Sequence, residues 1–217
     1  MINTLIITGG SIQRDFALSF IKKLQPDHII AIDKGLAFCS REQITPEYIA
    51  GDFDSLSPEI LEHYKKEKKI PIREYNPVKD ATDTCIGLEK AMEMGSTQIW
   101  LLGATGTRLD HVLCNIHILK RCRMKKIPAF IVDEHNLITL PVENEFTLKK
   151  SMQFGKYVSF FPLGEEVESL TLEGFKYPLK EYRLVNMEGL GVSNEICEET
   201  AKVKYEGGLL LMIQSRD

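Results

Sequence analysis

Two aspartates stand two residues apart in the segment Gly51-Asp52-Phe53-Asp54-Ser55, between a short aliphatic run and a helical pattern. In an extended chain such residues point to the same side, so both carboxylates can face one ion. Mg²⁺ takes oxygen ligands of this kind and completes its shell with water and substrate phosphates. The same spacing also fits an Asx-type turn followed by a helix N-cap at Asp54 or Ser55. Taken alone, the pair leaves both interpretations open.

A second acidic cluster, Asp80-Ala81-Thr82-Asp83-Thr84, comes directly before a helical pattern. One side chain is enough to cap a helix, but here two aspartates and two threonines crowd the same helix start. Amide groups at a helix N-terminus also bind phosphate, so a metal ligand beside them makes chemical sense. The combined pattern predicts a Mg²⁺ site built from Asp52, Asp54 and Asp83, in an enzyme that transfers phosphoryl groups.

The segment Arg108-Leu109-Asp110-His111 follows a glycine-rich stretch at residues 103–106. A bidentate arginine is a good partner for triphosphate oxygens. Alternatively, Arg108 and Asp110 form a surface pair worth under ~1 kcal/mol. The stretch lacks the Gly-Lys-Ser/Thr ending of a Walker A loop, so it is not diagnostic alone. We interpret His111 and His117 as ordinary helix histidines.

The elements that must position these residues alternate along the first two-thirds of the chain. Short aliphatic runs of the kind that form buried strands recur at residues 4–8, 28–32, 48–50, 99–102 and 129–132. Apolar stripes at helical spacing lie between them, at residues 16–24, 85–92 and 109–119, and a further helix is expected to begin near Ser57-Pro58. This alternation predicts βαβ units and a mostly parallel sheet. Because ligands bind beyond the carboxyl ends of such strands, we expect the candidate residues to meet at one edge.

The last third of the sequence changes character after Pro141. We expect short strands there, separated by turn signals such as Pro162-Leu163-Gly164, at residues 146–148, 157–161, 170–172, 182–185, 192–195, 201–205 and 209–214. Regular short strands of this kind indicate an antiparallel sandwich. The predicted domains are therefore an α/β domain at residues 1–142 and an all-β domain at residues 143–217.

Composition narrows the class of protein. The net charge of −4 gives no electrostatic reason to expect a nucleic-acid partner. The five cysteines are scattered and contain no Cys-x-x-Cys pair, which argues against a disulfide framework or a zinc site and favours a reducing compartment. No apolar run reaches the ~18 residues of a membrane span, and the first residues lack the pattern of a signal peptide. We expect a cytoplasmic protein without a membrane partner.

Five motifs, in their order along the chain, resemble the thiamine pyrophosphokinase (thiamine diphosphokinase) family. They are Asp33-Lys34-Gly35, Gly51-Asp52-Phe53-Asp54-Ser55, Lys79-Asp80-Ala81-Thr82-Asp83, Gly103-x-x-Gly106-x-Arg108-x-Asp110-His111 and Gly191-Val192-Ser193-Asn194-Glu195. The resemblance implies a three-layer α/β nucleotide-binding domain followed by a β-sandwich. It also implies transfer of the pyrophosphoryl group of ATP to the hydroxyl of thiamine, in a homodimer. Two residues depart from the family pattern: Lys34 replaces a common glycine, and Lys79 stands where some relatives have glutamine.

The resemblance assigns expected roles by position. It implies Mg²⁺ ligands at Asp52, Asp54 and Asp83, and contacts to ATP from Asp33, Lys34, Asp54, Ser55, Thr82 and Arg108. Thiamine and the transferred group would contact Asp80, Thr82, Ser193 and Asn194. The residues expected to act in catalysis are Asp80, Asp83, Arg108 and Asp110, with Asp80, Asp110 or solvent accepting the proton of the attacking alcohol.

Two alternatives stay open at the level of the sequence. A related pyrophosphokinase could act on a different alcohol, such as a hydroxymethylpterin, with the same aspartates and a different C-terminal domain. A nucleotide- or thiamine-binding sensor could keep the fold without turnover. The full acidic set argues against a sensor, because binding alone needs no site with three carboxylates.

Overall fold

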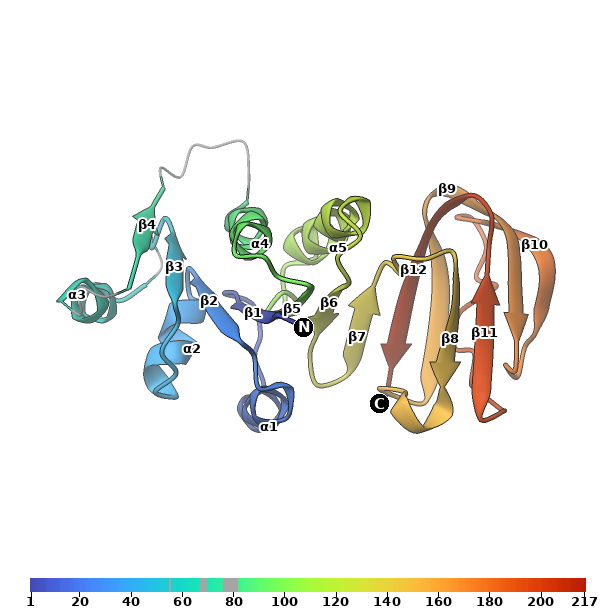
Figure 1. Ribbon diagram of the computed structural model, residues 1–217, viewed down its shortest axis with the longest axis horizontal. Coiled ribbons are helices and arrows are strands. Elements are labelled where there is room, and N and C mark those ends of the chain that lie inside the picture. The colour runs from blue at the N-terminus through green and yellow to red at the C-terminus, as the bar shows by residue number, and fades with distance from the viewer. Residues whose placement is uncertain (55, 67–69, 76–81) are drawn as a thin grey trace. The chain divides into compact units, whose positions relative to one another are not determined.

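The computed structural model describes residues 1–54, 56–66, 70–75 and 82–217. The chain forms two compact units (Figure 1). The first, here the α/β unit, comprises Met1–Ile118 and Ile131–Glu134, and the second, the β unit, comprises Leu119–Phe130 and His135–Asp217. Helix α5 (Leu109–Met124) and strand β6 (Ala129–Val132) each contribute residues to both units. The predicted boundary after residue 142 stays a prediction.

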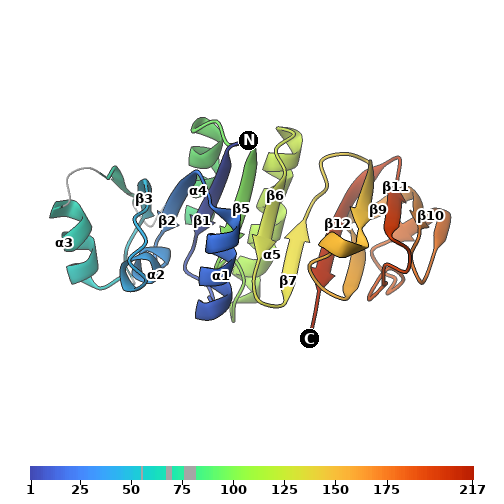
Figure 2. The same ribbon diagram turned by 60° about the horizontal axis from the view of Figure 1, so that its bottom comes forward.

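The α/β unit is built on a parallel sheet in the strand order β4-β3-β2-β1-β5 (Figure 2). Its strands are β1 (Asn3–Ile7), β2 (His28–Ile32), β3 (Tyr48–Gly51), β4 (Ile72–Glu74) and β5 (Gln98–Leu102). The central strand β1 buries Leu5, Ile6 and Ile7 completely, as expected for a strand covered on both faces. The predicted α/β class with an N-terminal parallel sheet is confirmed.

Helices cover both faces of this sheet. They are α1 (Arg14–Leu24), α2 (Gly35–Arg41), α3 (Pro58–Lys66), α4 (Asp83–Glu93) and the first turns of α5. Figure 1 shows α1 and α2 below the sheet and α4 above it. In α4, Gly87 lies against Ile32 and Ile6 so closely that a Cβ there would come 2.8 Å from the Ile32 side chain. This tight packing fixes the N-terminus of α4, and therefore Asp83, over the end of β2.

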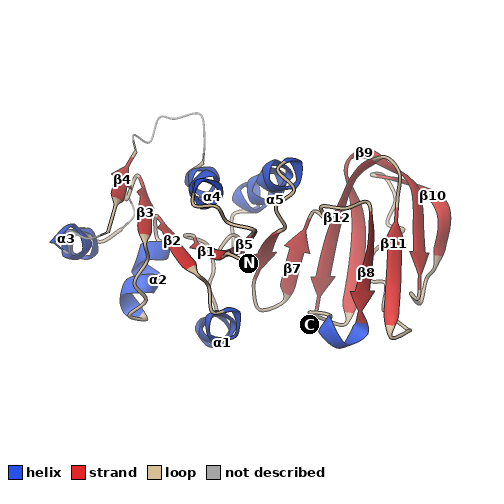
Figure 3. Cartoon of the chain, in the orientation of Figure 1, coloured by secondary structure: helices blue, strands red, loops and turns tan. Residues whose placement is uncertain are grey.

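The β unit is antiparallel, with the strand order β7-β12-β9-β11-β8 and with β10 paired to β9. Figure 3 shows that strands joined by loops make up its residues from 135 onward, with one short 3₁₀ helix, η1 (Lys150–Met152). The strands are β7 (Asn136–Thr139), β8 (Glu145–Lys149), β9 (Tyr157–Glu173), β10 (Leu179–Val185), β11 (Thr200–Lys204) and β12 (Gly208–Ser215). They enclose a core in which Phe160, Leu170 and Tyr205 are buried.

Three predictions about individual elements were wrong. The turn expected at residues 162–164 lies inside β9: Pro162 still pairs with Leu210 of β12, and the strand continues through a register shift to Val167, which pairs with Gly208. The strands expected at residues 157–161 and 170–172 are therefore parts of a single strand. Residues 192–195 form no strand but a single bridge between Asn194 and Val158. Elements α2, β4 and β7 were not anticipated. In the part of the chain that the structure describes, no helix is long and apolar enough to cross a membrane.

Candidate active site

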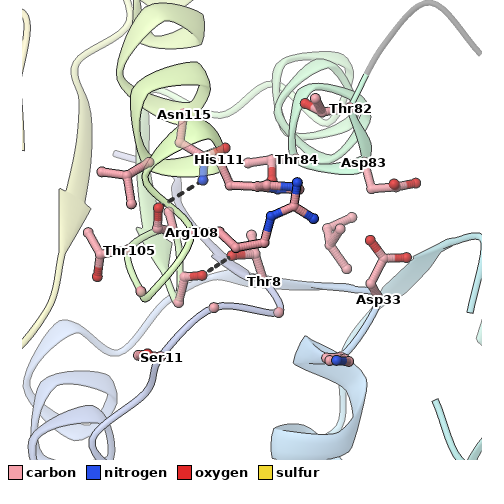
Figure 4. Close-up of a pocket in the computed structure, with 18 of the residues that line it drawn as sticks. Thr8, Ser11, Asp33, Thr82, Asp83, Thr84, Thr105, Arg108, His111 and Asn115 are labelled. Carbon is pink, nitrogen blue, oxygen red and sulfur yellow. Dashed lines mark hydrogen bonds between the residues drawn. The ribbon is translucent and has the colours of Figure 1, made fainter. Parts of the chain in front are cut away.

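A cavity of about 780 Å³ opens at the carboxyl ends of β1, β2 and β5 (Figure 4). Its walls are made by loops that leave these strands and by the first turns of α4 and α5. The lining residues are 8–11, 32–34, 82–84, 103–108, His111, Val112 and Asn115. The structure therefore brings Asp33, Asp83 and Arg108 together at one edge of the sheet, whereas no residue of the segment around Asp52 and Asp54 is among the lining residues.

The loops after β1 and β5 are hydrogen-bonded to each other across the floor of the cavity. Thr8 Oγ1 donates to Gly103 O at 2.5 Å, and the Gly10 amide donates to the same oxygen at 2.7 Å. The Ser11 amide donates to Thr105 O at 2.8 Å. A Cβ at Gly10 would overlap the carbonyl oxygens of Gly103 and Thr105, so this close approach requires glycine.

Two carboxylates lie on one side of the cavity, at Asp33 and Asp83 (Figure 4). Asp33 ends β2 in a left-handed conformation, with φ of 48°. Its Oδ1 accepts a hydrogen bond from the Asp52 amide at 3.1 Å, and it sits where a Cβ of Gly51 would be. The Asp33 carboxylate occupies the space that a side chain at position 51 would need, which explains the glycine before Asp52. Asp83 is the first residue of α4, whose N-cap Thr82 accepts a hydrogen bond from the Cys85 amide at 3.4 Å.

The segment around Asp52 and Asp54 is a turn. Phe53 has φ of 57°, and the Asp54 amide donates to Asp52 Oδ1 at 3.2 Å. The argument that an extended chain points both carboxylates to one side was therefore wrong, and the alternative Asx-type turn is what forms. Neither aspartate is among the residues that line the cavity. Asp80 and Ser55, two further predicted site residues, lie outside the described residues.

The donor chemistry of this region suits a hard cation. Among the described residues, no three or more His, Cys, Asp or Glu side chains are close enough together to hold a metal ion. What the region offers is oxygen: the carboxylates of Asp33 and Asp83 in the cavity wall, with Asp52 next to Asp33. Mg²⁺ is commonly held by one or two carboxylates, with substrate phosphates and water completing the octahedron. The residues present fit such an incomplete site, and the set Asp52, Asp54 and Asp83 remains a prediction.

Arg108 and Asp110 pair with each other at the start of α5. Arg108 Nη2 donates to Asp110 Oδ2 at 2.6 Å and Nε donates to Oδ1 at 3.2 Å, while both side chains are exposed. The hydrogen bond from Arg108 lowers the pKa of the Asp110 carboxyl, and the same contact raises the pKa of the guanidinium. Arg108 lines the cavity. Asp110 is not among the lining residues and contacts the cavity lining through its hydrogen bonds to Arg108. Lys34 is exposed, lines the cavity and is the N-cap residue of α2.

In the β unit, the predicted thiamine residues Ser193 and Asn194 differ in accessibility. Ser193 is exposed, and its amide donates to Ser159 Oγ at 2.9 Å. Asn194 is 2% exposed. Its Oδ1 accepts hydrogen bonds from the amides of Tyr177 and Glu195, at 3.0 and 2.9 Å, and its Nδ2 donates to Tyr177 O at 2.8 Å. The Asn194 side chain therefore holds two backbone segments together.

Comparison with known proteins assigns the chain to two domain models. Residues 22–131 match the model of the thiamin pyrophosphokinase catalytic domain, and residues 143–210 match the model of the thiamin pyrophosphokinase vitamin B1 binding domain. The chain belongs to the thiamine pyrophosphokinase family. The resemblance noted in the sequence is thus confirmed.

Individual thiamine pyrophosphokinases agree with this placement. The chain is 34% identical over 189 residues to the thiamine pyrophosphokinase of Bacillus subtilis (strain 168), covering 87% of each chain. Its fold matches a crystal structure of the Bacillus subtilis enzyme with a TM-score of 0.87, at 29% identity and 99% coverage of both chains. A structure from Geobacillus thermodenitrificans matches with a TM-score of 0.84, at 29% identity and with 100% of this chain and 98% of that one covered.

Within this family framework, the structure adds site residues that sequence reasoning missed. His111 and Asn115, one turn apart on α5, both line the cavity, and Asn115 is 6% exposed. His111 had been interpreted as an ordinary helix residue. A signal was available: both follow Arg108 at helical spacing, so they continue the same face of the helix.

Proposed function

We propose that this chain transfers the pyrophosphoryl group of ATP to the hydroxyl of thiamine, giving thiamine diphosphate and AMP. One observation carries the proposal: a cavity at the strand ends that combines the Asp33 and Asp83 carboxylates with the Arg108 guanidinium. Carboxylates beside a strong cation suit a magnesium triphosphate, because the metal and arginine together offset its charge.

The triphosphate of ATP is proposed to bind in this cavity. Mg²⁺ would be held by Asp52, Asp54 and Asp83, and it would neutralise charge on the phosphates when bound. Lys34 and Arg108 would add positive charge from the lining of the cavity, and Asp33 would border the nucleotide. Asp80, Thr82 and Asp83 are proposed to lie beside the transferred group, at the N-terminus of α4, where helix amides favour phosphate.

The reaction needs little covalent help from protein. The thiamine hydroxyl oxygen forms a bond to the β-phosphorus, the bond from that phosphorus to the α,β-bridging oxygen breaks, and AMP leaves. The task of the protein is to align the thiamine hydroxyl with the β-phosphorus and to stabilise the charge that develops on the departing oxygen, a role that we propose for Arg108. The hydroxyl proton goes to a base. Because Arg108 lowers the pKa of Asp110, that carboxylate is the weaker candidate, which favours Asp80 or solvent.

Thiamine is proposed to be held by the Ser193-Asn194 segment, with Ser193 offering its exposed hydroxyl and Asn194 acting through the backbone that it braces. The active protein is proposed to be a cytoplasmic homodimer. Sedimentation of the purified chain at increasing concentration tests the dimer independently of activity.

The test is a product assay. The purified protein is incubated with Mg²⁺, ATP and thiamine, and AMP and thiamine diphosphate are separated by chromatography. We expect both in equal amounts, and neither when EDTA replaces Mg²⁺. AMP formation with a hydroxymethylpterin and none with thiamine would assign a different alcohol. Binding of both substrates without any AMP would identify a sensor.

A further inference from the structure

Asn115 is a buried polar residue in the wall of the cavity. It lies in the second turn of α5, is 6% exposed, and lines the cavity with His111 and Arg108 from the same helix. Its Nδ2 donates a hydrogen bond to Ala104 O at 2.8 Å, drawn as a dashed line in Figure 4. Ala104 belongs to the loop after β5, which the Thr8 and Ser11 contacts already fix.

This contact determines which way the Asn115 amide faces. A backbone carbonyl can only accept a hydrogen bond, so the nitrogen of the amide must point to Ala104 and the oxygen must point elsewhere. No described residue donates a hydrogen bond to Asn115 Oδ1. Asn115 Oδ1 itself is not fully buried, so this oriented acceptor of a cavity-lining residue is accessible to a donor group of a ligand.

We propose that Asn115 Oδ1 accepts a hydrogen bond from an N–H or O–H group on the nucleoside part of the bound nucleotide. This inference rests on the proposed function, in which the cavity takes ATP. Phosphate oxygens near neutral pH are acceptors, so the triphosphate cannot supply the donor. The two groups of a nucleoside that can are the ribose hydroxyls and the amino group of adenine.

The positions of the charged residues agree with a nucleoside bound near Asn115. Asp33 and Asp83 stand at the end of β2 and the start of α4, while Asn115 stands on α5 beyond the loop after β5. A nucleotide whose phosphates lie toward the carboxylates, with their cation, places its nucleoside toward α5. Asn115 is then a specificity-determining residue for the donor pattern of that nucleoside.

The test measures binding of the nucleotide by calorimetry in the presence of Mg²⁺ and the absence of thiamine. The ligands are ATP, 2′-deoxy-ATP, 3′-deoxy-ATP and purine riboside triphosphate, which lacks the amino group. We expect wild-type protein to bind one analogue about 10- to 100-fold more weakly than ATP, and that analogue identifies the donor. In Asn115→Leu, which keeps the size of the side chain without its polar atoms, ATP and that analogue should bind equally weakly.

Two further variants keep the result interpretable. Asn115→Asp keeps an acceptor oxygen but replaces the donor to Ala104, so it should weaken ATP binding while retaining part of the discrimination, even where Asn115→Leu fails to fold. His117→Ala changes an exposed residue of the same helix outside the cavity lining and should behave as wild type. Equal binding of all four nucleotides to wild type, or unchanged discrimination in a folded Asn115→Leu protein, would overturn the inference. Nucleotide discrimination without thiamine turnover would instead overturn the proposed function alone.

Discussion

The two units use polar side chains in opposite ways. At the strand ends of the α/β unit, Asp33, Asp83 and Arg108 line a cavity, and the loops beneath them are held by backbone amides and by the Thr8 hydroxyl. In the β unit, Asn194 turns its whole amide into the fold and leaves only its neighbour Ser193 exposed. A motif residue can therefore contribute to a site in two ways: it can contact the ligand, or it can fix the conformation of the backbone that contacts the ligand.

The comparison predicts different experimental signatures for the two regions. Substitutions that change cavity side chains in the α/β unit should reduce activity and leave stability nearly unchanged. Substitutions of Asn194 should reduce stability first. The variants below test that contrast, beginning with the largest expected effect.

Asp83→Asn removes a negative charge from the cavity wall and keeps the shape of the side chain. We expect kcat/KM for the formation of thiamine diphosphate to fall by about 100- to 1,000-fold or more, because charge compensation at the transferred group is lost. The thermal midpoint should stay close to wild type. Glu93→Gln at the other end of α4, where Glu93 pairs with Lys90 at 3.2 Å on the surface, is the control and should keep full activity. An active Asp83→Asn protein would remove this residue from the site.

Asn194→Ala removes three hydrogen bonds from a buried position of the β unit. Since the amides of Tyr177 and Glu195 lose their acceptor, we expect a loss of about 2–4 kcal/mol in the free energy of unfolding, measured by urea denaturation. Ser193→Ala is the matched control: it should retain stability and raise the KM for thiamine. If Asn194→Ala were as stable as wild type and still failed to use thiamine, Asn194 would contact the ligand and the contrast between the units would collapse.

Gly10→Ala tests the junction of the two loops beneath the cavity. The added methyl group would overlap the carbonyls of Gly103 and Thr105, so the loops must separate. We expect a destabilisation of about 1–3 kcal/mol, together with weaker nucleotide binding, since the floor of the cavity moves. Gly164→Ala in β9, where no atom lies within 4 Å of the new methyl, should change neither quantity. A Gly10→Ala protein with normal ATP binding would show that the floor tolerates this shift.

Glu195→Gln is expected to have the smallest effect, and one that depends on pH. The hydrogen bond from Lys176 lowers the pKa of the Glu195 carboxyl below its ordinary value of 4.5, and Lys156 adds to this. A carboxyl with a lowered pKa in the folded state stabilises the protein above its unfolded pKa, and this contribution disappears as the pH falls through the folded pKa. Thermal midpoints should therefore differ slightly between wild type and variant at pH 7 and converge as the pH falls through the lowered pKa of Glu195 in the folded state. A constant difference across that range would exclude the ion pair as its cause.

Much of the α/β unit could be predicted because the strands and helices that its local sequence patterns favour are also the ones that its tertiary packing stabilises. Strands β2 and β6 begin and end where the aliphatic runs do, and the stripe at residues 109–119 marks α5. The order of strands then places their polar ends together, which is why Asp33, Asp83 and Arg108 could be expected to meet. Helix α2 has too few residues to show a period, and β4 is an edge strand of three residues with two exposed side chains, so neither gives a readable pattern.

The β unit was harder to read because its decisive contacts are distant in sequence. Pro162 and Gly164 are ordinary turn signals, yet β9 continues through them, because β12 pairs with Pro162 before a register shift and with Val167 after it. The same holds at one point of the α/β unit. Phe53 adopts a left-handed conformation directly after Asp52, whose amide donates a hydrogen bond to the Asp33 carboxylate, and spacing alone cannot reveal such a contact. The burial of Asn194 likewise depends on Tyr177 and Val158, which nothing near position 194 indicates.

The long strand β9 has a consequence for the order in which the β unit forms. It pairs with β10, β11 and β12, and β12 also supplies the partner of β7. During synthesis on the ribosome, β7 and β9 emerge well before β12. The edge of each strand that pairs with β12 therefore has no partner until β12 is synthesised. Pairings that close such long loops are slow and leave strands open to wrong partners. Nascent chains of this protein therefore expose these strand edges until β12 emerges, whereas β1 of the α/β unit has its partners β2 and β5 much earlier in synthesis.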